Sequence, residues 1–237
     1  MRHRTFRGRM QRVHDQFGHQ GGEWWTYTVH GDGTRTVRAM CEIEHREVTG
    51  RSVLRDVTYS MDDRFRPLDA FVRLTVNDRF RGSAWFRFAE DHAECEGFAA
   101  DLGRYRQRWP LATRALAFGS HPLFCDTLLC ARFDHSRPER VQRLDQVLLS
   151  SLEHDGASGP MLGAISFSIE YVGRERVTVP AGTFEADHYR FLLDGALPKD
   201  HPVEELWCVP REYTFVKVRI GGYIATSYEL AEFQGPS

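Results

Sequence analysis

The stretch Leu68–Asn77 reads LDAFVRLTVN, and it decides the fold class because its side chains alternate with a period of two. One set holds Leu68, Ala70, Val72, Leu74 and Val76, and the other holds Asp69, Phe71, Arg73 and Thr75. Successive side chains of a β-strand point to opposite faces of a sheet. The stretch therefore predicts a strand with one aliphatic face and one face that mixes charges with an aromatic ring.

Similar stretches rich in β-branched and aromatic residues continue on both sides of this strand. Toward the N-terminus and just beyond it, we expect strands at residues 24–30, 35–45, 52–61, 83–89 and 92–98, with a weaker one within 101–117. Turn signals such as Thr-Gly at 49–50 and Asn-Asp at 77–78 separate them. Short connections favour antiparallel pairing of consecutive strands, so this half reads as a meander.

The C-terminal half repeats the strand pattern. Strands are expected at residues 141–150, 162–171, 174–179, 183–192, 203–209, 214–220 and 223–230. About a dozen strands in one flat sheet would expose long unpaired edges. We therefore predict an all-β protein whose large antiparallel meander is closed or rolled into a lipocalin-like barrel. One domain would span residues 23–237, and the basic segment 1–22 would be helical or packed on the barrel.

The stretch FGSHPLFCDTLLC at residues 118–130 interrupts the strands and predicts the one short helix, a plug or lid of the barrel. Ser120 would be its N-cap and Pro122 would occupy its first turn. His121 and Cys125 would share one helix face. His121 is thus either a general acid or base at the helix N-terminus or a cap residue beside an apolar plug. The sequence lacks a second pair of ligands beside these two residues, so we predict no metal.

Composition and missing motifs exclude several function classes. The 237 residues carry a formal net charge of −2, and acidic residues interleave with basic ones, so we predict no nucleic-acid partner. No apolar run approaches the roughly 18 residues of a membrane helix. The sequence lacks the glycine-rich phosphate-binding motifs G-x-x-x-x-G-K-[ST] and G-x-G-x-x-G, and we predict no cofactor.

The cysteines and the N-terminus bear on the compartment. Five cysteines, odd in number and without C-x-x-C spacing, fit reduced thiols. The basic N-terminus has no apolar stretch behind it, unlike a secretory signal. We therefore expect a cytoplasmic protein with no membrane contact, and we leave a homodimer open.

Arginines share strand faces with aromatic and titratable side chains. Such pairs are Arg38 with Glu42, Arg55 with Tyr59, Phe71 with Arg73, Trp85 with Arg87, and His188 with Arg190. On one interpretation these faces are solvent-exposed, and an ion pair accounts for Glu42. On the other, they line a wide lumen in which rings bury a ligand and guanidinium groups bind its carboxylate.

The passage 171–191 followed by 205–230 resembles a known family. Val179-Pro-Ala-Gly-Thr-Phe184 and then Trp207 are similar to bacterial β-rich, lipocalin-like domains of unknown function that carry V-P-A-G-T-F between paired strands. The resemblance covers roughly the last third of the chain. It implies a rolled sheet around a cavity and assigns no catalytic residue.

Together these observations predict a small-molecule site inside the barrel. The first hypothesis is a cofactor-independent lyase, decarboxylase or isomerase that moves a proton on a small aromatic or amphipathic carboxylic acid. Its candidate catalytic residues are His121, His188 and Tyr59. The candidate ligand-binding residues are Arg38, Glu42, Arg55, Phe71, Arg73, Trp85, Arg87, Arg190 and Trp207. The alternatives are a non-catalytic carrier of a small hydrophobic ligand and, if the interior is fully packed, a structural module.

Overall fold

One rolled sheet dominates the structure. The computed structural model describes residues 3–192, 203–222 and 224–236. In this part of the chain, fifteen strands form a single sheet in the order β8-β7-β6-β5-β4-β3-β2-β1-β15-β14-β13-β12-β11-β10-β9. Consecutive neighbours pair antiparallel, except that β10 and β9 run parallel. The predicted all-β antiparallel meander is therefore confirmed.

Most strands lie close to their expected bounds, whereas β2 and β6 begin earlier than the sequence pattern indicates. They are β1 (Arg4–His14), β2 (Gly18–Val29), β3 (Arg35–His45), β4 (Arg51–Met61), β5 (Pro67–Val76), β6 (Arg79–Phe88), β7 (His92–Ala99), β8 (Gly103–Pro110), β9 (Phe118–Gly119), β10 (Val141–Leu149), β11 (Gly163–Val179), β12 (Gly182–Leu192), β13 (Glu204–Val209), β14 (Thr214–Ile220) and β15 (Thr226–Gln234). The helical elements are α1 (Arg46–Thr49), α2 (Leu123–Leu129) and the 3-10 helix η1 (Cys130–Arg132). The two strands expected at 162–179 are one strand with an irregular pairing near Tyr171 and Gly173.

The first and last strands pair in the middle of the sheet. β1 lies between β2 and β15, with Met10 opposite both Glu23 and Leu230. The expectation that the segment 1–22 is helical or packed on the barrel is therefore wrong for residues 4–14 and 18–22, which are strands of the sheet itself. Phe6, Met10 and Arg12 of β1 are buried, so this stretch contributes to the core directly.

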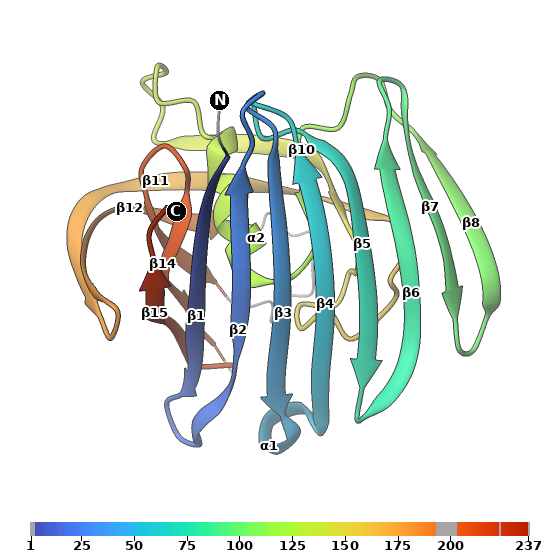
Figure 1. Cartoon of the computed structure of the whole chain (residues 1–237), viewed down its shortest axis with the longest axis horizontal. Helices are drawn as coiled ribbons and strands as arrows, with labels where there is room; N and C mark the ends of the chain where they lie inside the picture. Colours follow the sequence, from blue (N-terminus) through green and yellow to red (C-terminus); the bar gives the residue numbers. More distant parts are fainter. Residues whose placement is uncertain (1–2, 193–202, 223, 237) are drawn as a thin grey trace.

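The sheet rolls around a core without closing. Figure 1 shows β1–β8 as one broad layer, with β10–β12 crossing behind it and α2 between the two. Side chains connect the open side: Gln107 of β8 accepts from the Leu162 N–H at 2.8 Å, and Tyr105 donates to the carbonyl of Pro160. These contacts link β8 at one edge of the sheet to the segment that precedes β11.

Alternation along each strand sorts side chains into an inner and an outer face. In β5, Ala70, Val72 and Leu74 are fully buried, whereas Phe71 and Arg73 are exposed. The inner faces pack together as one large cluster because aliphatic and aromatic area gains most from leaving water. The centre of the roll is therefore mostly filled by side chains.

The short helix α2 packs inside the roll as a plug. Phe124 packs against Trp25 and Tyr27, with ring centroids 4.3 and 5.3 Å apart. Six of its seven residues are buried. The helix begins at Leu123, two residues later than expected, because His121 adopts a left-handed φ of 77°. Ser120 is therefore not its cap.

Three smaller expectations can be compared with the structure. Val179 pairs with Gly182 across the predicted Pro-Ala-Gly hairpin, and Gly182 has a φ of 137°, which favours glycine. All five cysteines lie in the described residues, and all are free and buried. No helix in the described part of the chain has the length and apolar character needed to cross a bilayer.

Candidate functional site

A cavity lies between α2, the inner faces of β10–β13 and the loop after β10. Its main chamber measures about 90 Å³, and an adjoining chamber of about 50 Å³ shares four lining residues with it. Those four are His121, Asp126, His154 and Glu204. The apolar wall of the main chamber consists of Leu129, Leu149, Leu152, Ile165, Phe167 and Phe191. The cavity is therefore amphipathic, with its titratable groups gathered where the chambers meet.

Asp126 and Glu204 form an acidic pair at this junction. Asp126 comes from α2, and Glu204 begins β13 opposite Phe191. Burial raises the pKa of Asp126 to about 7, although the positive charge of Arg55 acts in the opposite direction. Burial also raises the pKa of Glu204 well above its usual range, and the charge of Asp126 adds to this effect. The pair thus retains a proton near neutral pH.

One oxygen of Glu204 has an unusual environment. Its Oε1 is buried and has no hydrogen-bond partner among the residues that the structure describes. Buried carboxyl oxygens normally accept or donate a hydrogen bond, because leaving one unpaired costs about 1–3 kcal/mol. This oxygen is accordingly the strongest single indication that a polar group of a ligand binds here.

Two histidines complete the polar end. His121 lies where α2 begins, and its Nε2 is 3.0 Å from the carbonyl oxygen of Ser151, so this nitrogen carries the proton. His154 lies in the loop after β10 and lines both chambers. In the described residues, no group of three or more His, Cys, Asp or Glu side chains is arranged to hold a metal ion.

Arg55 of β4 holds the loop that carries His154. Its guanidinium donates to Ser150 Oγ at 2.7 Å and to the carbonyl oxygen of Gly156. Gly156 has a φ of 67°, and a Cβ there would lie 2.9 Å from an Arg55 nitrogen, so a larger residue would be strained at this position. Arg55 is therefore a buried anchor for the cavity wall.

Glu23 of β2 positions the helix. Its two carboxyl oxygens accept the backbone N–H groups of Leu123 and Phe124 at 2.8 and 3.1 Å. These donors lack partners within the first turn of a helix. Burial nevertheless raises the pKa of Glu23 to about 8. By fixing the first turn, Glu23 sets the direction in which Asp126 points.

Three of the predicted site residues lie on the inner side. His121 lines the cavity, and Arg55 supports it. Tyr59 is also buried, but it packs edge-on against Phe118 with centroids 5.8 Å apart and lines neither chamber. Arg55 and Tyr59 thus share a face as predicted, and Tyr59 belongs to the packed core.

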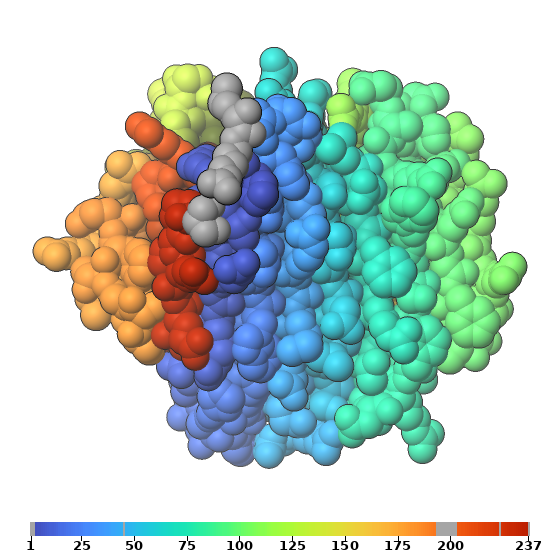
Figure 2. Space-filling view, viewed as in Figure 1, coloured from blue at the N-terminus to red at the C-terminus, as the bar shows by residue number. Residues whose placement is uncertain are grey.

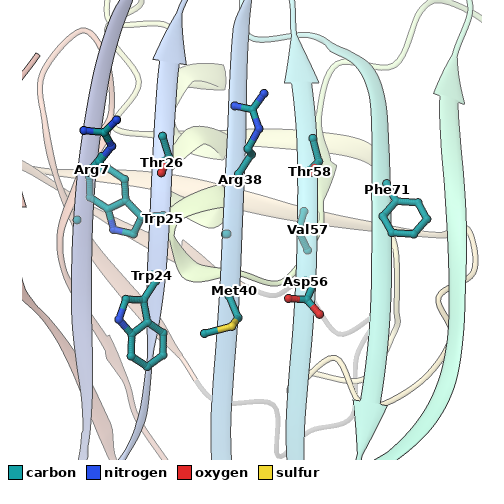
Figure 3. Close-up of a pocket in the computed structure, with 12 residues that line it drawn as sticks. Arg7, Trp24, Trp25, Thr26, Arg38, Met40, Asp56, Val57, Thr58 and Phe71 are labelled. Carbon is teal, nitrogen blue, oxygen red and sulfur yellow. The ribbon is translucent and has the colours of Figure 1, made fainter. Parts of the chain in front are cut away.

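The expectation that the other arginine and aromatic faces in the first half line the lumen is wrong. Arg38, Glu42, Phe71, Arg73, Trp85 and Arg87 all lie on the outer face of β3, β5 and β6. Figure 3 shows Arg38 and Phe71 around a shallow outer hollow with Trp24 and Met40. The grouping of side chains by strand face was correct. The aliphatic group lies inside because burying unpaired guanidinium groups costs far more free energy than burying aliphatic side chains. Arg87 instead stacks on Trp85, with its guanidinium carbon 4.2 Å from the ring centroid.

His188, Arg190 and Trp207 also lie away from the cavity. His188 stacks on Trp207 with ring centroids 4.1 Å apart, on the face of β12 and β13 opposite the buried Tyr189 and Leu206. Arg190 forms ion pairs with Glu205 at 2.8 Å and with Glu170 at 3.1 Å. These contacts account for all three residues on the outer surface of the sheet.

Asp126, His154 and Glu204 line the cavity but were not among the residues predicted from the sequence. Asp126 is the single charged residue of the apolar helix α2, which is a usable signal. Glu204 shares strand parity with the buried Leu206 and Cys208, so alternation alone could have placed it inside. His154 lies in a loop whose sequence has no periodicity, and nothing in the neighbouring sequence indicates that its side chain points inward.

Comparisons with known proteins support the fold. The solved structure of a β-barrel-like protein of the domain of unknown function DUF1849, from Brucella abortus, is similar over 98% of this chain and 97% of that chain, with a TM-score of 0.55 and 9% identity. A putative exported protein with a YmcC-like fold, from Bacteroides fragilis, aligns over 98% of this chain and 95% of that chain with 10% identity. Its TM-score of 0.33 is too low to support a conclusion about the fold. No protein-family model and no curated protein sequence matches the chain. The resemblance drawn from residues 179–184 is thus supported only as a β-barrel-like fold of unknown function.

Proposed function

We propose that this chain is a binding protein for a small amphipathic molecule held in the cavity beneath α2. The observation that carries this proposal is the separation of the cavity wall into an aliphatic and aromatic part and one acidic end. Ligand sites typically combine a mostly apolar wall with a few polar groups that fix orientation. A packed structural module has no need for an unpaired buried carboxyl oxygen such as Glu204 Oε1.

The size of the cavity limits the ligand. A dry protein cavity of ~150 Å³ is known to admit benzene. The two chambers, of about 90 and 50 Å³, are together of this order. The ligand, or the part of it that enters the cavity, is therefore of the size of one substituted ring or a short branched chain.

The experiment compares a filled cavity with a filled outer hollow. Ile165→Trp places a large ring in the cavity, and Thr58→Trp places the same ring in the outer hollow. Toluene and benzyl alcohol should raise the melting temperature of the parent protein and of Thr58→Trp, but not of Ile165→Trp. A shift that survives Ile165→Trp and is lost in Thr58→Trp would overturn the proposal. If Ile165→Trp does not fold, Leu149→Phe provides the same comparison.

An enzyme that uses acid–base chemistry is the second candidate, favoured by the pKa of about 7 at Asp126. A group that titrates near neutral pH is suited to proton transfer. In such an enzyme, His121 would keep its predicted role in proton transfer, and Asp126 would replace His188 and Tyr59 as its partner. Mass spectrometry of bound compounds after incubation separates the two functions, because an enzyme converts them and a carrier returns them unchanged. Loss of conversion in Asp126→Asn would assign the proton transfer.

A further inference from the structure

The acidic pair indicates which chemical class of ligand the cavity takes. Resting on the proposed binding function, we infer that the ligand carries a protonated amine, which binds between Asp126 and Glu204 while its apolar body contacts Phe167 and Phe191. This is the opposite charge from the carboxylic acid that the arginine pattern suggested.

The charged side chains around the cavity favour a cationic ligand. Four of the five arginines expected to bind a carboxylate lie on the outer face, and the fifth, Arg55, is engaged by Ser150 and Gly156. Two further arginines near the cavity are also engaged: Arg12 donates to Tyr228, and Arg51 pairs with Glu153 and Asp155. Two carboxyl groups line the junction itself. An anionic ligand would meet like charge in a region of low dielectric, whereas an ammonium group would meet opposite charge.

The unpaired oxygen of Glu204 favours the same kind of ligand. An ammonium group has three N–H donors and no acceptor, so it can bind Glu204 Oε1 and the carboxylate of Asp126 at once. Charge-assisted hydrogen bonds of this kind are stronger than neutral ones. On binding, the Asp126–Glu204 pair would release its proton, and the positive charge of the ammonium group would compensate the negative charge of the pair.

This mechanism makes binding depend on pH. The charged and titratable groups around Asp126 come from several elements: Glu204 from β13, Glu23 from β2, Arg55 from β4, Tyr228 from β15, and His121, His154 and Asp155 from the adjacent loops. The buried thiols of Cys41, Cys125 and Cys130 also lie near it. As the pH falls through the pKa of about 7 at Asp126, the carboxyl becomes neutral and its attraction for a cation is lost. Affinity for an amine should therefore fall in acid.

Three probes of nearly equal shape test the inference. Benzylamine is cationic, benzyl alcohol is neutral and benzoate is anionic at a pH of about 8. Calorimetric titration should give benzylamine at least about tenfold tighter binding than benzyl alcohol, with benzoate weakest. The advantage of benzylamine should shrink about tenfold at a pH of about 5.5, where the pair is protonated.

Neighbouring glutamates provide the matched variants. Glu204→Gln should reduce the preference for benzylamine, because it removes one of the two carboxyl groups, and it should leave benzyl alcohol binding unchanged. Glu205→Gln, one residue along on the outer face, should leave both unchanged. Asp126→Asn gives a second, near-isosteric test if Glu204→Gln folds poorly.

The outcomes separate the two proposals. Benzoate or benzyl alcohol binding as tightly as benzylamine, or an equal loss in both glutamate variants, overturns the amine while leaving the binding function in place. Failure of toluene and all three probes to bind overturns the binding function, and the amine inference falls with it.

Discussion

Phe71 and Phe86 lie on the neighbouring strands β5 and β6, yet the first side chain is 45% exposed and the second is fully buried. The same contrast holds between Arg73, which is exposed, and Arg55, which is buried. Figure 2 shows the outer surface that β1–β8 spread over one side of the molecule. Residue type alone therefore does not decide what a side chain does in this protein. The face of the sheet decides it.

The largest expected difference between the inner and outer faces is the pH dependence of stability that the buried Glu23 causes. Its folded pKa of about 8 lies above the ordinary value of 4.5, so the folded state holds a proton that the unfolded chain releases. The resulting stabilisation is complete below pH 4.5 and is lost as the pH rises through 8, by at most about 5 kcal/mol. Urea unfolding at several pH values should show this loss relative to Glu23→Gln. Glu42→Gln on the outer face should track the parent, and a parallel profile for Glu23→Gln would contradict the assignment.

The two phenylalanines should differ strongly on truncation. Phe86→Ala removes a ring from the filled core and should cost about 3–5 kcal/mol of unfolding free energy. Phe71→Ala removes a half-exposed ring and should cost under about 1 kcal/mol. Chemical denaturation of both variants measures the difference, and equal costs would mean that the two faces are not distinguished as described.

Truncation of the buried Arg55 should cost more unfolding free energy than truncation of the exposed Arg73, although the difference should be smaller than for the two phenylalanines. Arg55→Ala removes two charged hydrogen bonds to the cavity wall and should cost about 2–3 kcal/mol, together with weaker ligand binding. Arg73→Ala removes a cation stacked on Phe80 and should cost under about 1 kcal/mol. A neutral Arg55→Ala variant with intact ligand binding would show that the loop holds its place without this anchor.

The smallest effect is expected at His188. Burial against Trp207 lowers its pKa below the ordinary value, and the nearby Glu205 and Glu175 act in the opposite direction. A base with a lowered pKa contributes stability above its unfolded pKa of about 6.5, and that stability is lost as the pH falls. This slope is opposite in sign to that of Glu23. Thermal unfolding of His188→Gln between pH of about 5 and 8 should differ from the parent by under about 1 kcal/mol.

The sequence predicted most of the strands and the grouping of side chains by face, but it missed β1 and the start of β2. Alternation in residues 68–77 correctly groups Leu68, Ala70 and Val72 against Phe71 and Arg73. It does not say which group lies inside, because that depends on how much of the interior the aliphatic groups fill once the sheet rolls. In this chain they fill most of it.

The candidate site was less accessible from sequence because it assembles from distant segments. Asp126, Glu204 and His154 come from the helix, the start of β13 and a loop. His121 was found because it precedes a helix with a recognisable start. Glu23, whose carboxyl fixes that helix, lies about a hundred positions earlier, and only the three-dimensional structure connects the two.

The location of the binding cavity can be measured most directly by diffraction from crystals pressurised with xenon, which enters apolar cavities of this size. We predict a xenon peak beneath α2, among Leu149, Ile165 and Phe167. A peak confined to the outer hollow beside Trp24, Met40 and Phe71, with nothing beneath the helix, would contradict it.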